Sequence, residues 1–107
     1  MTLDDYLAHD ATGLAQLVAN GDVTPRELLD LARERAGQVN GRLNAIVTPM
    51  DSQADAIVDG TLSGPFAGVP FMLKDLGQDF NGLPNGTGSN ALKNVPAPDP
   101  ATQVQRW

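Results

Sequence analysis

One lysine stands at the end of an apolar segment, in a position where a charged side chain could do chemistry. The segment GPFAGVPFMLKD, residues 64–75, runs directly into Lys74. A lysine that a strand delivers into a low-dielectric site loses part of its preference for the charged form, so it can act as a general base near neutral pH. A lysine at a strand end can also extend its ammonium group into water. The spacing alone leaves both interpretations of Lys74 open.

A glycine-rich segment, GTGSNA at residues 86–91, formally matches the fingerprint of dinucleotide-binding proteins. That fingerprint requires a strand before it and a helix after it. Here the turn sequence FNGLPN precedes it, and Pro96 limits any helix that follows. A P-loop is excluded because no Lys-Ser or Lys-Thr follows the glycines. The sequence therefore argues against nucleotide binding.

The remaining polar residues offer neither an acid/base pair nor a metal site. Asp75 and Asp79 lack the apolar surroundings and paired spacing that carboxylate catalysis needs. On an extended strand Asp75 faces away from Lys74, so we expect it to anchor the following turn. His9 is the single histidine and cysteine is absent. We expect no metal ion and no cofactor.

Composition limits the size and the partners of the protein. A chain of 107 residues can bury one modest core, which predicts a single domain. Thirteen acidic residues outnumber seven scattered basic ones, for a net charge of −6, which argues against binding to nucleic acid or to an anionic membrane. The acidic start does not resemble a signal peptide, and no apolar run has membrane-spanning length. We expect a soluble, cytoplasmic protein.

The elements that would position Lys74 begin with helices. One starts near Asp10 or Thr12 and stops at Asn20-Gly21. The next has Thr24 as its cap, Pro25 in the first helical position and a capping box with Glu27, and we expect it to end by residues 40–41. A weaker helix is predicted over residues 51–59.

Strands and loops follow the helices in the prediction. LNAIVT, residues 43–48, favours a short buried strand. Residues 66–73 are again apolar, but Pro70 favours an edge or irregular position. Residues 77–100 contain many glycines and prolines and predict a loop. ATQVQRW, residues 101–107, predicts the first turn or two of a helix capped by Asp99. Because the sequence ends inside that helix, we expect a truncated chain or a piece of a larger fold.

Three segments together resemble the amino-terminal part of the amidase signature family. They are GPFAGVPFMLKDL (64–76), GLPNGTGSNAL (82–92) and DPATQVQRW (99–107), and the upstream helices and LNAIVT occur in the expected order. The resemblance covers the chain from about Ala11, and its G-V-P-F-x-x-K-D core is fairly specific. It is similar to bacterial amidases and to linear or cyclic amide hydrolases, and more distantly to the glutamine-dependent amidotransferase subunits of the same family.

The resemblance implies a Ser-cisSer-Lys triad in which Lys74 matches the family lysine. In such a triad a neutral lysine takes a proton from the bridging serine, which takes one from the nucleophilic serine. The residues Thr87, Gly88 and Ser89 occupy the place of a loop near the active site, so they are candidate supporting residues; a tight turn with local hydroxyl bonds explains them equally well. The implied fold is α/β, a mixed sheet flanked by helices, of which residues 1–107 form one partial domain.

The sequence departs from the family in one respect that concerns activity. Both serines of the triad would lie beyond Trp107, and Ser52, Ser63 and Ser89 lack the glycine-serine flanks of a nucleophile. We therefore expect the isolated chain to be inactive and a full-length parent to hydrolyse a small-molecule amide. The alternative is a non-catalytic binding or assembly module that retains the scaffold. Apolar surface left uncovered in a partial domain also predicts self-association.

Overall fold

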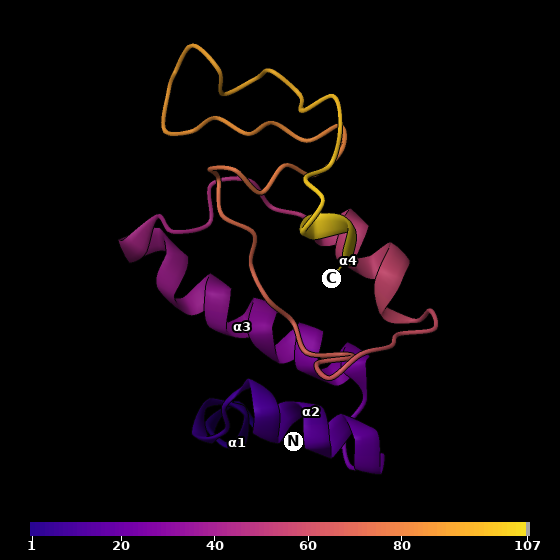
Figure 1. Ribbon diagram of the computed structural model, residues 1–107. Coiled ribbons are helices and arrows are strands. Elements are labelled where there is room, and N and C mark those ends of the chain that lie inside the picture. The colour runs from indigo at the N-terminus through magenta and orange to yellow at the C-terminus, as the bar shows by residue number, and fades with distance from the viewer. Residues whose placement is uncertain (107) are drawn as a thin grey trace. The chain divides into compact units, whose positions relative to one another are not determined.

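The computed structural model describes residues 1–106, and it divides into two compact units, Met1–Pro70 and Phe71–Trp107. Helices make up most of the first unit, whereas the second consists largely of turns and loops (Figure 1). In chain order the helices are α1 (Leu3–Ala8), α2 (Ala11–Asn20), α3 (Pro25–Leu43), α4 (Asp51–Val58) and the short 3-10 helix η1 (Val104–Arg106).

The helix starts follow the predicted capping chemistry. Asp10 caps α2 by accepting a hydrogen bond from the Gly13 amide at 2.8 Å. At the start of α3, the Thr24 hydroxyl accepts from the Glu27 amide at 3.2 Å and the Glu27 carboxylate accepts from the Thr24 amide at 2.8 Å. These reciprocal bonds satisfy amide groups that have no partner within the helix. The predicted starts of α2 and α3 are confirmed.

Helix α1 was not predicted, although the sequence carries its signal. Thr2 and Asp5 form a second capping box, in which the Thr2 hydroxyl accepts from the Asp5 amide at 3.1 Å and the Asp5 carboxylate accepts from the Thr2 amide at 2.9 Å. The side-chain bond from Thr2, followed by the backbone bond, lowers the pKa of Asp5. The acidic residues at the start of the chain therefore belong to a capped helix.

Helix α3 runs to Leu43, beyond the end predicted at residues 40–41. It ends at Asn44, which adopts a left-handed conformation with φ of 48°. The side chain of Asn40 binds both backbone groups of Ile46: its Nδ2 donates to the carbonyl oxygen at 3.0 Å, and its Oδ1 accepts from the amide at 2.8 Å. Asn40, which suggested the end of the helix, therefore lies within it and binds the segment that follows the helix.

The described part of the chain is helical, and the mixed sheet of the predicted α/β fold is not seen in it. Residues 1–106 contain no β-strand, and their β-pairing is limited to one isolated bridge between Pro84 and Pro96. In residues 43–48, the backbone amide and carbonyl of Ile46 are hydrogen-bonded to the Asn40 side chain. In a β-strand these two groups would bond to a neighbouring strand instead. In residues 64–69 the amides of Ala67 and Val69 donate to carbonyls three residues earlier, which makes turns.

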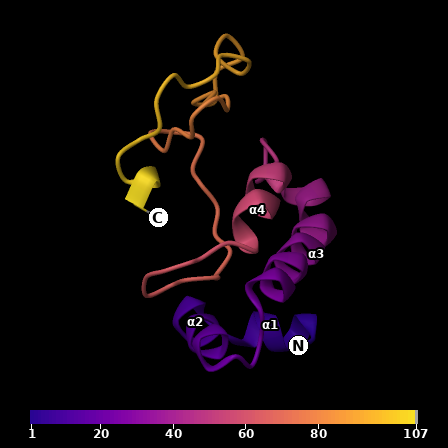
Figure 2. The same cartoon turned by 90° about the vertical axis from the view of Figure 1, so that its right-hand side faces the viewer.

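The core of the first unit is small and lies where α2 and α3 meet. Leu14, Val23 and Leu28 are buried, and Leu28 is fully inaccessible to solvent. The partly buried residues around them are Tyr6, Leu17, Val18 and Val69. Figure 2 shows α1 and α2 together at one end of α3, with α4 alongside α3. The amphipathic spacing of the helices thus places one apolar cluster at their junction.

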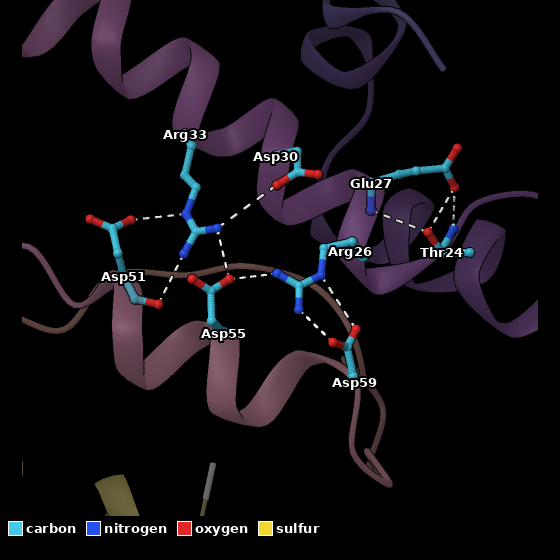
Figure 3. Close-up of polar contacts among 8 residues, drawn as sticks. All are labelled: Thr24, Arg26, Glu27, Asp30, Arg33, Asp51, Asp55 and Asp59. Atoms are coloured by element: carbon cyan, nitrogen blue, oxygen red, sulfur yellow. Dashed lines mark hydrogen bonds and ion pairs between the residues drawn. The ribbon is translucent and has the colours of Figure 1, made fainter.

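Ion pairs join α4 to α3, as Figure 3 shows. Arg33 donates to Asp51 and to Asp55 at 2.9 Å each, and Arg26 bridges Asp55 and Asp59. Hydrogen bonds from Arg33, and then from Arg26, lower the pKa of Asp55. The predicted helix over residues 51–59 is confirmed as α4; its described contacts with α3 include these ion pairs, and none of its residues is fully buried.

The second unit is held by backbone bonds across its loop. The Gly82 amide donates to the Ala97 carbonyl at 3.0 Å, and the Ala97 amide donates to the Leu83 carbonyl at 2.9 Å. Ala97 is buried. The helix predicted from residue 101 is limited to η1 among the described residues, and Trp107 lies outside them. No helix within residues 1–106 is long and apolar enough to cross a membrane.

Candidate functional site

The apolar segment that leads to Lys74 divides between the two units, and its first half packs on the helices. Gly68 has φ of 82°, and a Cβ atom built there would lie 2.8 Å from Pro25 Cγ and 3.1 Å from Val18 Cγ1. Val69 packs against the core cluster. This part of the motif requires glycine because the backbone has a positive φ and approaches α2 and α3 closely.

Lys74 belongs to the second unit, and its side chain is exposed. Its backbone amide donates to Gln78 Oε1 at 2.6 Å, which closes a turn after the apolar segment. The neighbouring Met72 and Leu76 are also exposed. Of the two interpretations that the spacing left open, the described residues show Lys74 exposed to solvent, and its role as a catalytic base stays a prediction.

Asp75, the residue next to Lys74, forms a hydrogen bond with the glycine-rich loop. Its Oδ1 accepts a hydrogen bond from the Gly86 amide at 2.7 Å, and Gly86 is buried. A Cβ atom at Gly86 would lie 3.3 Å from Asp75 Oδ2 and 3.5 Å from the Cα of Lys93, so the loop approaches Asp75 closely. Asp75 anchors a turn, as predicted. It is not the turn that directly follows Asp75, however, but one that begins at Gly86, eleven residues further along the chain.

The candidate supporting residues form a tight turn immediately after that contact. The Ser89 amide donates to the Gly86 carbonyl at 2.7 Å, and both Thr87 and Gly88 have positive φ, 47° and 73°. The Ser89 hydroxyl accepts from the Ala91 amide at 3.3 Å. Thr87 and Gly88 are exposed and Ser89 is partly buried. The loop has the turn geometry and the local hydroxyl bond that the sequence allowed, and its part in an active site stays a prediction.

A second carboxylate holds the other side of the same loop, and sequence reasoning missed it. The Asn85 amide group donates to Asp79 Oδ1, and the Asp79 carbonyl accepts from the Ala101 amide at 2.9 Å. Asp75 and Asp79 therefore hold consecutive loop residues, Gly86 and Asn85. The available signal was the presence of two aspartates four residues apart before a loop rich in turn residues.

The sequence predicted no metal site, and the described residues contain no group of three or more histidine, cysteine, aspartate or glutamate side chains that could hold a metal ion. His9 is exposed, with its Nδ1 2.8 Å from the Asp5 carbonyl oxygen. In the second unit, exposed Lys74 directly precedes Asp75, and the carboxylates of Asp75 and Asp79 hold the loop at Gly86 and Asn85.

Comparison with known proteins identifies several curated relatives. The chain is 41% identical over 70 residues to a 6-aminohexanoate-cyclic-dimer hydrolase of a Pseudomonas strain, a match that covers 65% of this chain and 14% of that protein. It is 35% identical over 105 residues to a lipoamidase of Enterococcus faecalis, covering 94% and 14%. It is 38% identical over 103 residues to a glutamyl-tRNA(Gln) amidotransferase subunit of Deinococcus radiodurans, covering 90% and 21%. No protein-family model matches the chain, and no solved structure does.

These relatives are enzymes named for reactions at amides, two as hydrolytic enzymes and one as part of an amidotransferase. They are amidase signature enzymes, so the resemblance that the sequence predicted is confirmed. The chain spans only about a seventh to a fifth of the length of these proteins. It is a partial-length relative of the amidase signature family.

Proposed function

We propose that this chain is a segment of an amidase signature hydrolase that cleaves carboxamide C–N bonds in a small-molecule substrate. The observation that carries the proposal is the similarity of nearly the whole chain to enzymes of this kind. The match to the lipoamidase covers 94% of the chain, so it includes residue 74. In the complete enzyme, residues 1–107 would form part of one domain with the α/β fold of the family.

Lys74 is the proposed base of a Ser-cisSer-Lys triad. A neutral lysine would accept a proton from the bridging serine, which would accept one from the nucleophilic serine as that serine attacks the amide carbonyl. The amine would leave with a proton, and water would then cleave the acyl-enzyme. Because Lys74 is exposed here, the complete enzyme would have to cover it to favour its neutral form.

The test is a substitution of Lys74 in the polypeptide encoded by the complete reading frame. Lys74→Ala should lower kcat on a simple amide by about 10²- to 10⁴-fold, the usual contribution of a general base. Lys93→Ala is the matched control, because Lys93 is the other exposed lysine of the second unit. Near-wild-type turnover by Lys74→Ala would refute the assignment. The 107-residue chain alone should not hydrolyse the same amide.

A non-catalytic binding or assembly module is the second candidate. The exposure of Lys74 favours it, since a catalytic base is expected in a more enclosed site. Reading the gene beyond the codon for Trp107 separates the two functions. A continuation that encodes a glycine-serine-rich segment with two serines supports the hydrolase, and a stop codon supports the module.

A further inference from the structure

The Asp75 carboxylate joins two parts of the chain that the proposed function places in one active site. Asp75 follows Lys74 directly, and it accepts a hydrogen bond from Gly86, the first residue of the loop 86–89. We infer that Asp75 is a positioning residue, which fixes the backbone of Lys74 relative to this loop. The inference rests on the proposed function, because it gives Asp75 a role in the reaction that Lys74 would catalyse.

The contact has the features of a bond that sets a position. The distance of 2.7 Å is typical of a charge-assisted hydrogen bond between an amide and a carboxylate, which is stronger than a neutral one. Gly86 is buried and Asp75 is partly buried, so the Gly86 amide would lose its partner without an easy replacement by water. Glycine at residue 86 also allows the approach, because a Cβ atom there would crowd Asp75 Oδ2 at 3.3 Å.

The Lys74 backbone is held from a second direction as well. Its amide donates to Gln78 Oε1 at 2.6 Å, while the next residue is tied to Gly86. These two bonds fix the point from which the Lys74 side chain starts and leave the side chain itself free. Because its backbone is already held in place, Lys74 can reach a serine supplied by the rest of the enzyme without first ordering that backbone.

The first test measures the contact in the 107-residue chain by amide hydrogen exchange. Asp75→Ala removes the acceptor, so the Gly86 amide should exchange at least about tenfold faster. Asp75→Asn keeps an uncharged acceptor and should give an intermediate rate. Asp99→Ala is the matched control, because Asp99 is an exposed aspartate of the same unit whose carboxylate has no hydrogen bond among residues 1–106, and it should leave Gly86 unchanged. Equal Gly86 rates in Asp75→Ala and Asp99→Ala would overturn the inference.

The second test separates positioning from structure in the polypeptide encoded by the complete reading frame. Asp75→Ala should lower kcat at least about tenfold with KM within about twofold, and Asp75→Asn should restore part of kcat. A change in KM alone, or a kcat equal to that of Asp99→Ala, would overturn the role. If Lys74→Ala remains active, the proposed function fails instead, and Gly86 exchange still decides whether the contact exists. If Asp75→Ala does not fold, the Asp75→Asn variant carries both readouts.

Discussion

Gly68 lies at the point where the characteristic GPFAGVP segment meets the helical core. Its φ of 82° is strained for any residue with a Cβ atom, and Pro25 and Val18 occupy the space that a Cβ atom would need. Gly64, four residues earlier, has φ of 105° but no heavy atom within 4 Å of the same position. A side chain at Gly64 would meet backbone strain alone, whereas a side chain at Gly68 would meet both backbone strain and close packing.

Gly68→Ala should lower the free energy of unfolding by more than Gly64→Ala. We expect about 1–3 kcal/mol from the positive φ in both variants, with an additional loss at Gly68 because a contact of 2.8 Å forces the backbone or Pro25 to move. Urea titration of both variants, followed by the helical circular dichroism signal, measures the difference. Equal losses would mean that Pro25 adjusts without cost.

The residues of the candidate site were predictable only in part. A lysine at the end of an apolar run and an aspartate that anchors a turn can be recognised from local sequence, and the Asp75 contact fits that expectation. The partner Gly86 is eleven residues away in an irregular loop. No periodicity connects such residues, so this contact could not be predicted, whereas the exposure of Lys74 is one of the two interpretations that the spacing left open.

At the scale of elements, the attachment of α4 depends on charge and should respond to pH. The pKa of Asp55 lies below its ordinary value of 3.8 because Arg33, and then Arg26, donate hydrogen bonds to it. A carboxylate with a lowered pKa stabilises the folded state above its ordinary pKa and loses that contribution as the pH falls through the lowered value. The contribution is modest, since the carboxylate is exposed and salt screens it.

Acidification below pH 3.8 should therefore loosen α4, and Asp55→Asn should loosen it already at neutral pH. Hydrogen exchange of the α4 amides is the measurement, with several-fold faster exchange expected in the variant at pH 7 and little further change on acidification. Asp22→Asn is the control, because Asp22 is exposed in the same unit and has no ion pair among residues 1–106. Slow α4 exchange in Asp55→Asn would show that other contacts hold the helix.

Most of the helices could be predicted, whereas the strand predicted over residues 43–48 does not form, for a physical reason visible at Asn40. Capping boxes such as Thr24 with Glu27 are local, so their sequence pattern nearly determines where the helix starts. A strand needs a partner that supplies hydrogen bonds, and in its absence local groups compete for them. The Asn40 side chain takes both backbone groups of Ile46, in the segment whose composition favoured a strand.

At the scale of the whole molecule, the buried core is small. Leu14, Val23, Leu28 and Ala97 are the buried apolar residues among residues 1–106, and Leu28 alone is fully inaccessible. Large apolar side chains are exposed in each unit. Examples are Leu43, Val47 and Ile57 in the first, and Met72, Leu76, Leu92 and Val95 in the second. A chain with so little burial should be marginally stable.

We predict that the chain self-associates and that salt promotes the association. Exposed apolar side chains favour contact between copies, while the net charge of −6 opposes it, and salt screens that repulsion. Sedimentation equilibrium should show a mean mass above 11.3 kDa that rises with protein concentration and with added sodium chloride. The double variant Leu43→Gln, Val47→Thr removes two of the exposed side chains and should reduce the mean mass, whereas Asp22→Asn should not. A monomer at every concentration that unfolds in one sharp, cooperative transition would contradict the prediction, because it would mean that the small core suffices and the exposed residues do not associate.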